Sequence, residues 1–171
     1  PESGKEYTDS DGTKMLYMEG IREEYSEEIY NYVDVEYQVY YKIEPIKWRV
    51  LAVDGDDVFL LADKNLDCKP YNETNANISW EDCSLQKWVN TDFLNGAFSG
   101  LQQLAVKQTR RAVEDNSGTG ASGISYSTEK IYLLSNIEAT NPAYGFCAGS
   151  QKESETKEVK NTDYASECGA A

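Results

Sequence analysis

The chain has 171 residues, enough for one average domain, and its 40% hydrophobic and 12% aromatic residues can bury a core. With 16 basic and 30 acidic residues, its net charge of −14 repels nucleic-acid phosphates and anionic membrane surfaces. The sequence contains no histidine, which excludes imidazole bases and histidine-based metal sites. Composition therefore favours an acidic, non-catalytic domain without cofactor, metal or nucleic acid.

The N-terminal part divides into a polar stretch and a periodic one. Residues 1–14 are polar apart from Tyr7, so we expect a flexible tether followed by a single domain over residues 15–171. A helix is predicted over 15–33, because apolar residues recur there at spacings of three and four. These residues are Met18, Ile21, Tyr25, Ile29 and Val33.

The next segment, residues 35–63, is rich in β-branched and aromatic residues and predicts strands. Asp54-Gly55 is a turn dipeptide between two apolar runs, 48–53 and 58–62, and predicts a β-hairpin. Because both runs are almost continuously apolar, we expect both faces of this sheet to be covered.

Helix signals follow in the middle of the chain. Ser79 is a predicted N-cap, and a stripe of Leu85, Trp88, Val89 and Phe93 predicts a helix that ends at Asn95-Gly96. Capping-box patterns at 99–102 and 135–138 predict two further short helices, the second after a strand over 130–134. Residues 115–128 and 149–161 are polar and predict exposed loops. The fold class is therefore α+β, with a mainly antiparallel sheet and two or three short helices.

Four cysteines allow three disulfide connectivities or buried thiols. Pairing neighbours in the sequence joins Cys68 to Cys83 and Cys147 to Cys168, and closing a loop of about 15 residues is worth roughly 3 kcal/mol. Alternatively, Cys83 is a small apolar residue on a buried helix face. Disulfides persist in oxidising compartments, so we expect the pairing only if the protein is exported.

Two short patterns suggest chemistry without completing it. Ser84-Leu-Gln-Lys87 has the serine–lysine spacing of penicillin-recognising enzymes, but their Lys-Thr-Gly segment is absent, and a surface lysine explains Lys87. Asp54-Gly-Asp-Asp57 is acidic like a calcium loop but is short and lacks the closing glutamate, so it is read as a turn.

Several stretches together resemble a known family: Glu44–Leu51, Leu66–Asn72, Ser79–Asn90 with Phe93 and Ala97-Phe98, and Lys130–Ser135 with Glu138-Ala139. In this order they resemble an uncharacterised domain family of secreted and cell-surface proteins of Gram-positive gut bacteria. The resemblance covers roughly residues 40 to 168. It implies a fold similar to C-type-lectin-like and sulfatase-modifying-factor-like domains, and a C-terminal continuation beyond Ala171, so we expect this sequence to be part of a longer domain.

We therefore expect an extracellular or cell-surface recognition or scaffold module that is not an enzyme. A glycan or a peptide is the expected ligand, and we expect no membrane insertion. The expected site is the loop between Cys68 and Cys83, where an aromatic ring beside amides can hold a ligand through Tyr71, Asn72, Asn75 and Asn77. The alternatives are a purely structural spacer and a thiol-dependent enzyme of the sulfatase-modifying-factor type.

Overall fold

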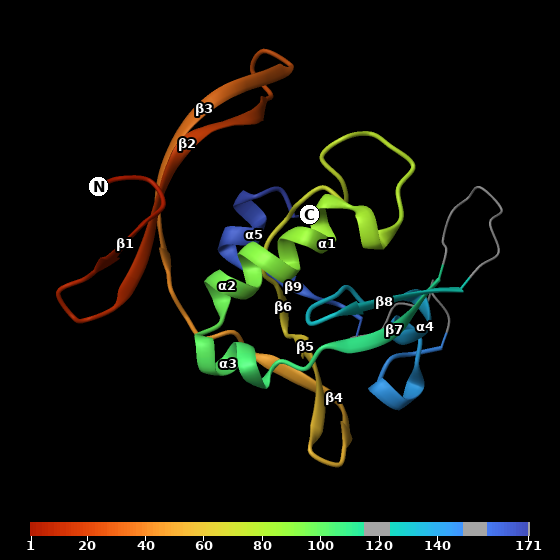
Figure 1. Cartoon of the computed structure of the whole chain (residues 1–171). Helices are drawn as coiled ribbons and strands as arrows, with labels where there is room; N and C mark the ends of the chain where they lie inside the picture. The colour runs from red at the N-terminus through yellow and green to blue at the C-terminus, as the bar shows by residue number, and fades with distance from the viewer. Residues whose placement is uncertain (115–123, 149–156, 171) are drawn as a thin grey trace. The chain divides into compact units, whose positions relative to one another are not determined.

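The computed structural model describes residues 1–114, 124–148 and 157–170. Contacts divide the chain into two compact units. Unit 1 consists of Pro1–Arg49, Ala62–Asp67 and Asn161–Ala171, and unit 2 of Val50–Leu61 and Cys68–Lys160. Antiparallel strand pairs and short helices build both units (Figure 1), so the predicted α+β class with mainly antiparallel strands is confirmed. The single domain over residues 15–171 stays a prediction.

Unit 1 is built on a three-stranded antiparallel sheet in the order β1-β2-β3. The strands are β1 (Lys5–Thr8), β2 (Lys14–Ser26) and β3 (Asn31–Lys42). Figure 1 shows β2 and β3 as a long curved ribbon that ends in a turn. Helix α5 (Asp163–Glu167) belongs to the same unit, and its Tyr164 ring meets the Tyr41 ring edge-on at 5.4 Å.

The predicted helix over residues 15–33 is wrong, because this stretch forms β2, the turn and the start of β3. The two strands pair from Met15 opposite Lys42 to Ser26 opposite Asn31. A lone amphipathic helix would need another element to cover its stripe, whereas the Val- and Tyr-rich strand that follows supplies a cross-strand partner at every position. The helical spacing of the apolar residues was therefore overridden by long-range pairing.

The expected tether over residues 1–14 also differs from the structure. Lys5–Thr8 forms β1 and pairs with β2. Tyr7 explains the ordering, because its ring lies 6.3 Å from both the Tyr17 and the Tyr40 ring, while those two are 4.9 Å apart. Tyr17 is 2% exposed. Its hydroxyl donates to Glu19 at 2.5 Å, and this hydrogen bond, together with burial, raises its pKa to about 12.

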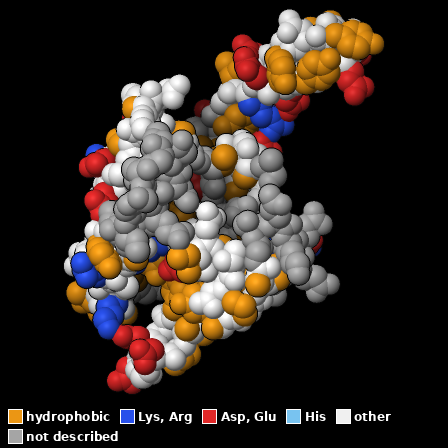
Figure 2. Space-filling model, turned by 90° about the vertical axis from the view of Figure 1, so that its right-hand side faces the viewer, with side chains coloured by type: hydrophobic (Ala, Val, Ile, Leu, Met, Phe, Trp, Pro, Cys, Tyr) orange, Lys and Arg blue, Asp and Glu red, His pale blue; other side chains and the backbone are white. Residues whose placement is uncertain are grey.

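The end of the β2–β3 ribbon exposes large side chains. Tyr30 is 82% exposed and has a positive φ of 52°, which is unusual for a residue with a side chain. Tyr25 and Tyr32 pair edge-on across the strands at 5.5 Å and are both more than half exposed. Figure 2 shows hydrophobic side chains and carboxylates together on this end of the ribbon, at the top of the view.

The predicted hairpin around Asp54-Gly55 is confirmed as β4 (Trp48–Asp54) and β5 (Asp57–Ala62), with Gly55 at φ +58° in the turn. The expectation that both of its faces are covered is wrong. Val50, Val53 and Val58 are each more than half exposed. Among the described residues the hairpin is a two-stranded sheet, so only part of its surface finds a partner. Phe59 does, stacking 5.9 Å from Tyr132.

A chain of short helical segments replaces the single predicted helix in unit 2. Its turns are η1 (Trp80–Asp82), α1 (Ser84–Trp88), the π-helical η2 (Val89–Phe93), α2 (Leu94–Ala97) and α3 (Gly100–Ala105). Ser79 precedes η1 without a side-chain cap, and Cys83 caps α1 instead. The helical run ends at Ala97, one residue beyond the predicted stop at Asn95-Gly96. The capping box of Ser99 and Gln102 is confirmed.

The rest of unit 2 is a strand pair followed by short helices. Its elements are the antiparallel strands β7 (Thr109–Glu114) and β8 (Ile124–Glu129), helix α4 (Asn136–Ala139) and turn η3 (Pro142–Tyr144). The capping box of α4 is confirmed, but the strand predicted over 130–134 is wrong because β8 ends at Glu129. Most of the two predicted loops, 115–123 and 149–156, lies outside the described residues.

A two-stranded sheet joins β6 (Lys64–Asn65) to β9 (Lys160–Asn161). The core of unit 2 gathers around Trp80, Cys83 and Val89, with Leu85 and Trp88 packed against them. Within the described parts of the chain, no helix has the length and apolarity required to cross a bilayer.

Candidate functional site

A buried carboxylate, Glu129 at the end of β8, holds the helical segments of unit 2 against the strands. The indole N–H of Trp80 lies 2.8 and 3.0 Å from its two oxygens, and the Ser127 hydroxyl donates to it at 2.8 Å. The Gln86 amide of α1 donates at 3.2 Å. Glu129 is 3% exposed, so these donors replace the water that its charge would otherwise need.

Arg111 of β7 extends this buried network towards α4. Its guanidinium lies 3.7 Å from Glu129 and 2.7 Å from Glu138, and it also donates to the Leu133 carbonyl at 3.0 Å. The same guanidinium stacks 4.0 Å from the Tyr132 ring centroid, and burial raises the pKa of that tyrosine to about 12. Because each carboxylate is engaged by several donors, we interpret this network as a scaffold.

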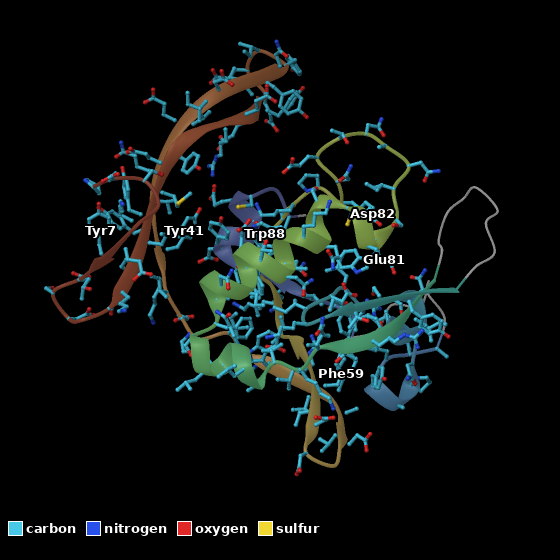
Figure 3. The ribbon with its side chains drawn as sticks, viewed as in Figure 1. Tyr7, Tyr41, Phe59, Glu81, Asp82 and Trp88 are labelled. Carbon is cyan, nitrogen blue, oxygen red and sulfur yellow. The ribbon has the colours of Figure 1, made fainter. Side chains whose placement is uncertain are left out.

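A groove of about 390 Å³ lies on the surface of the same unit, between the start of the 70–79 loop and the α1–η2 segment. We call it the acidic groove. Figure 3 labels Trp88 on α1, and Asp82 on the turn that precedes that helix. The groove is lined by Asn72, Glu73, Asp82, Ser84, Lys87, Trp88, Thr91 and Asp92.

The loop side of the groove is fixed by Asn72. Its side-chain oxygen Oδ1 accepts the Ser84 backbone N–H at 3.0 Å, and its side-chain Nδ2 donates to the Thr74 backbone carbonyl at 2.9 Å. The Glu73 backbone N–H donates to the Ser84 hydroxyl at 2.9 Å. Asn72 therefore ties the loop to the first residue of α1, so its side chain positions the groove wall.

The structure brings together only part of the predicted site. Asn72 lines the acidic groove, whereas Tyr71, Asn75 and Asn77 are exposed on the loop and do not line it. Tyr71 is 46% exposed, and its ring lies 6.3 Å from that of buried Trp80. Burial, with Cys83 nearby, raises the pKa of Tyr71. A binding role for these four residues stays a prediction.

Trp88 has a mixed environment. We predicted it as a core residue, and it does pack against the Trp80 cluster and lie 5.6 Å from the Phe93 ring. It is also half-buried and lines the acidic groove. The Lys69 ammonium lies 4.7 Å from the centroid of its ring, a cation–π contact. Part of the Trp88 indole therefore faces solvent, and its ring already contacts one cation, the Lys69 ammonium.

Sequence reasoning missed the charged groups of the groove. Glu73, Asp82 and Asp92 are exposed, and Asp82 accepts the Ser79 hydroxyl at 3.0 Å. A usable signal was present, since Ser84, Lys87, Trp88 and Thr91 recur at helical spacing and so share one face. The sequence predicts Lys87 as a surface residue and Trp88 as a core residue, because the polar loop that closes the groove over them has no periodic pattern.

The predicted disulfides are absent, since the structure contains no bond between any two of the four cysteines. Cys83 is 0% exposed, and its sulfur accepts the Gln86 backbone N–H at 3.4 Å as the cap of α1. This is the alternative of a buried thiol. Cys147 and Cys168 are not bridged either. Across residues 1–114, 124–148 and 157–170 no cluster of three possible metal-ligating Cys, Asp or Glu side chains occurs.

The model of a domain of unknown function, DUF6273, matches residues 55–169. The chain therefore belongs to the DUF6273 family. The match begins in the β4–β5 turn, so the β1–β3 sheet lies outside it. No curated protein and no solved structure matches the chain significantly.

Proposed function

We propose that this chain is a non-catalytic recognition module of a secreted or cell-surface protein, and that it binds positively charged peptide segments in the acidic groove. The observation that carries the proposal is the composition of this groove. It places three exposed carboxylates around one half-buried indole, with Lys87 as the one lysine in its lining.

The groups of the groove complement a lysine or arginine side chain. Carboxylates accept charge-assisted hydrogen bonds from both, and an indole face attracts a cation within about 6 Å. Lys69 makes this contact with Trp88 inside the chain. A net charge of −14 adds long-range attraction, which speeds the encounter with a basic partner.

The other functions receive less support. A neutral glycan would use the same indole and hydroxyls, but it would leave the carboxylates without counter-charges. A thiol-dependent enzyme needs an accessible thiolate, whereas Cys83 is buried and accepts a backbone N–H. A sequence without histidine supports the non-catalytic part of the proposal.

The test is fluorescence anisotropy with a fluorescein-labelled hexapeptide of alternating lysine and glycine. Surface ion pairs contribute about 0.5 kcal/mol each, so replacing all three carboxylates should weaken binding about tenfold. The variant is Glu73→Gln with Asp82→Asn and Asp92→Asn. The matched control, Glu23→Gln with Glu27→Gln and Glu28→Gln in unit 1, changes the net charge equally but should alter the Kd by less than about twofold.

Equal weakening by both triple variants would show non-specific attraction to an acidic protein and contradict the proposal. Binding of a neutral tetrasaccharide, lost in the groove variant, together with no peptide binding, would assign the groove to glycans. No binding of either probe would favour the spacer. The location is tested separately, by fractionating cells that produce the full-length precursor, and a purely cytoplasmic distribution would contradict it.

A further inference from the structure

The sheet of unit 1 has a long open edge. In the order β1-β2-β3, the last strand pairs with β2 alone, so one side of Asn31–Lys42 carries backbone groups that form no ladder with another described strand. Such an edge is a template for a further strand. Natural proteins shield such edges with prolines, bulges, short length or charged side chains. β3 has 12 residues and no proline, and its charged residues are Asp34, Glu36 and Lys42.

The hydrogen bonds of unit 1 identify which residues face this edge. The Ile43 backbone N–H donates to the Lys14 carbonyl at 2.9 Å, so residue 43 faces β2. Backbone groups alternate along an antiparallel strand, and the even-numbered residues of β3 therefore direct theirs to the open edge. Their side chains form the exposed face of the strand: Tyr32, Asp34, Glu36, Gln38, Tyr40 and Lys42.

The charges on that face discriminate between possible registers with a second copy. A two-fold axis at Glu36 would place that carboxylate opposite itself, and an axis at Val35 would place Asp34 opposite Glu36. Like charges directly opposite each other are destabilising. An axis at Val39 would pair Glu36 with Lys42, but it would pair only residues 36–42. An axis at Gln38 places Asp34 opposite Lys42 of the second copy at both ends of the longer pairing 34–42 and brings the two Gln38 amides together.

The opposite face of β3 fits the same register. There Val35 would lie opposite Tyr41 of the second copy and Tyr37 opposite Val39, both apolar pairs that favour sheet pairing. Tyr37 leans over Gly20 on β2, where a Cβ atom would come within 3.1 Å of its ring, and so leaves the open edge clear. Antiparallel pairing also places the acidic turns of the two copies, residues 27–30, at opposite ends of the joined sheet, where they do not repel each other.

We propose that two copies of the chain associate by antiparallel pairing of their β3 strands in the register centred on Gln38. The occupant of the open edge is thus a second copy of this chain. The interface is isologous, so every contact away from the axis occurs twice. Its area is small, which makes the dimer weak and concentration-dependent. In the monomer the Lys42 ammonium lies 2.8 Å from the Glu44 carboxylate. Because this ion pair is exposed, replacing it by a pair with Asp34 of the second copy costs little.

Sedimentation velocity across a concentration series tests the pairing, because the parent chain should shift from monomer to dimer as concentration rises. Asp34→Lys alone and Lys42→Asp alone each place like charges opposite each other, so both should remain monomeric. The double variant restores the two opposite-charge pairs and should dimerise like the parent. Circular dichroism must show parent-like strand content for each variant to be scored.

A parent chain that stays monomeric at every concentration would overturn the proposal. Dimers in all variants would overturn the edge contact, and failure of the double variant to dimerise would overturn the register. Gln38→Pro gives an independent check. A proline there removes an edge-facing N–H that the monomer does not use, so it should abolish the dimer and preserve the fold. A dimeric Gln38→Pro variant would refute strand pairing.

Discussion

Replacing Glu129 with alanine tests whether the buried network holds unit 2 together. The substitution leaves the Trp80 indole N–H without its acceptor and takes one carboxylate from Arg111, whose side chain is only 9% exposed. Removing one partner of a buried charge pair costs about 3–5 kcal/mol, because the other charge stays desolvated. We therefore expect a loss of about 4 kcal/mol from the free energy of unfolding. This is a large part of the roughly 5–15 kcal/mol by which domains of this size are stable.

The assay is urea unfolding followed by far-ultraviolet circular dichroism at neutral pH. The matched control is Glu81→Ala, which removes an exposed glutamate next to Trp80 and should change the free energy by no more than about 0.5 kcal/mol. A large midpoint shift for Glu129→Ala with an unchanged slope supports the reasoning. Equal midpoints for the two variants would refute the structural role of the network.

Three further predictions concern single positions. Burial raises the pKa of Tyr132 to about 12 from the ordinary 10.0, so the stabilisation by its neutral form is fully present below pH 10 and is lost as pH rises through 12. In urea titrations between these pH values, the stability of Tyr132→Phe should therefore depend less on pH than that of the parent. An identical pH dependence would contradict this cause. Ser135→Ala removes half of the capping box of α4 and should cost about 1 kcal/mol in urea, whereas a change near zero would show that the cap contributes nothing. Gly55→Ala forces a side chain into the positive φ of the β4–β5 turn and should lower stability by about 1–2 kcal/mol; an unchanged melting temperature in thermal unfolding would contradict this reading of the turn.

Local signals in the sequence predicted much of unit 2 correctly. Asp54-Gly55 identified a hairpin, and the serines at 99 and 135 identified two capping boxes, because each depends on residues within four positions of one another. The strand predicted over 130–134 is wrong, since the backbone N–H groups of Lys130 and Ile131 donate to the side chain of Asn90, which lies 40 and 41 residues away and which no local pattern links to them.

Unit 1 could not be predicted locally. The apolar spacing from Met18 to Val33 satisfies a helical period, yet the stretch forms two strands, because Val35, Tyr37 and Val39 supply a pairing partner beyond the turn. The acidic groove was missed for a related reason. Asn72 closes it by bonding to Ser84, 12 residues further along the chain, so the carboxylates on either side converge only in the folded unit.

The central claim, recognition of cationic peptide segments by the acidic groove, can be tested most directly by following the indole N–H resonances in a nitrogen-15 NMR titration. The chain has three tryptophans, and the structure assigns them different roles. On adding the lysine–glycine hexapeptide, the Trp88 signal should move saturably. The Trp80 signal should stay in place, because its N–H is bonded to buried Glu129. An unmoved Trp88 signal, or equal movement of the Trp80 and Trp88 signals, would contradict the account.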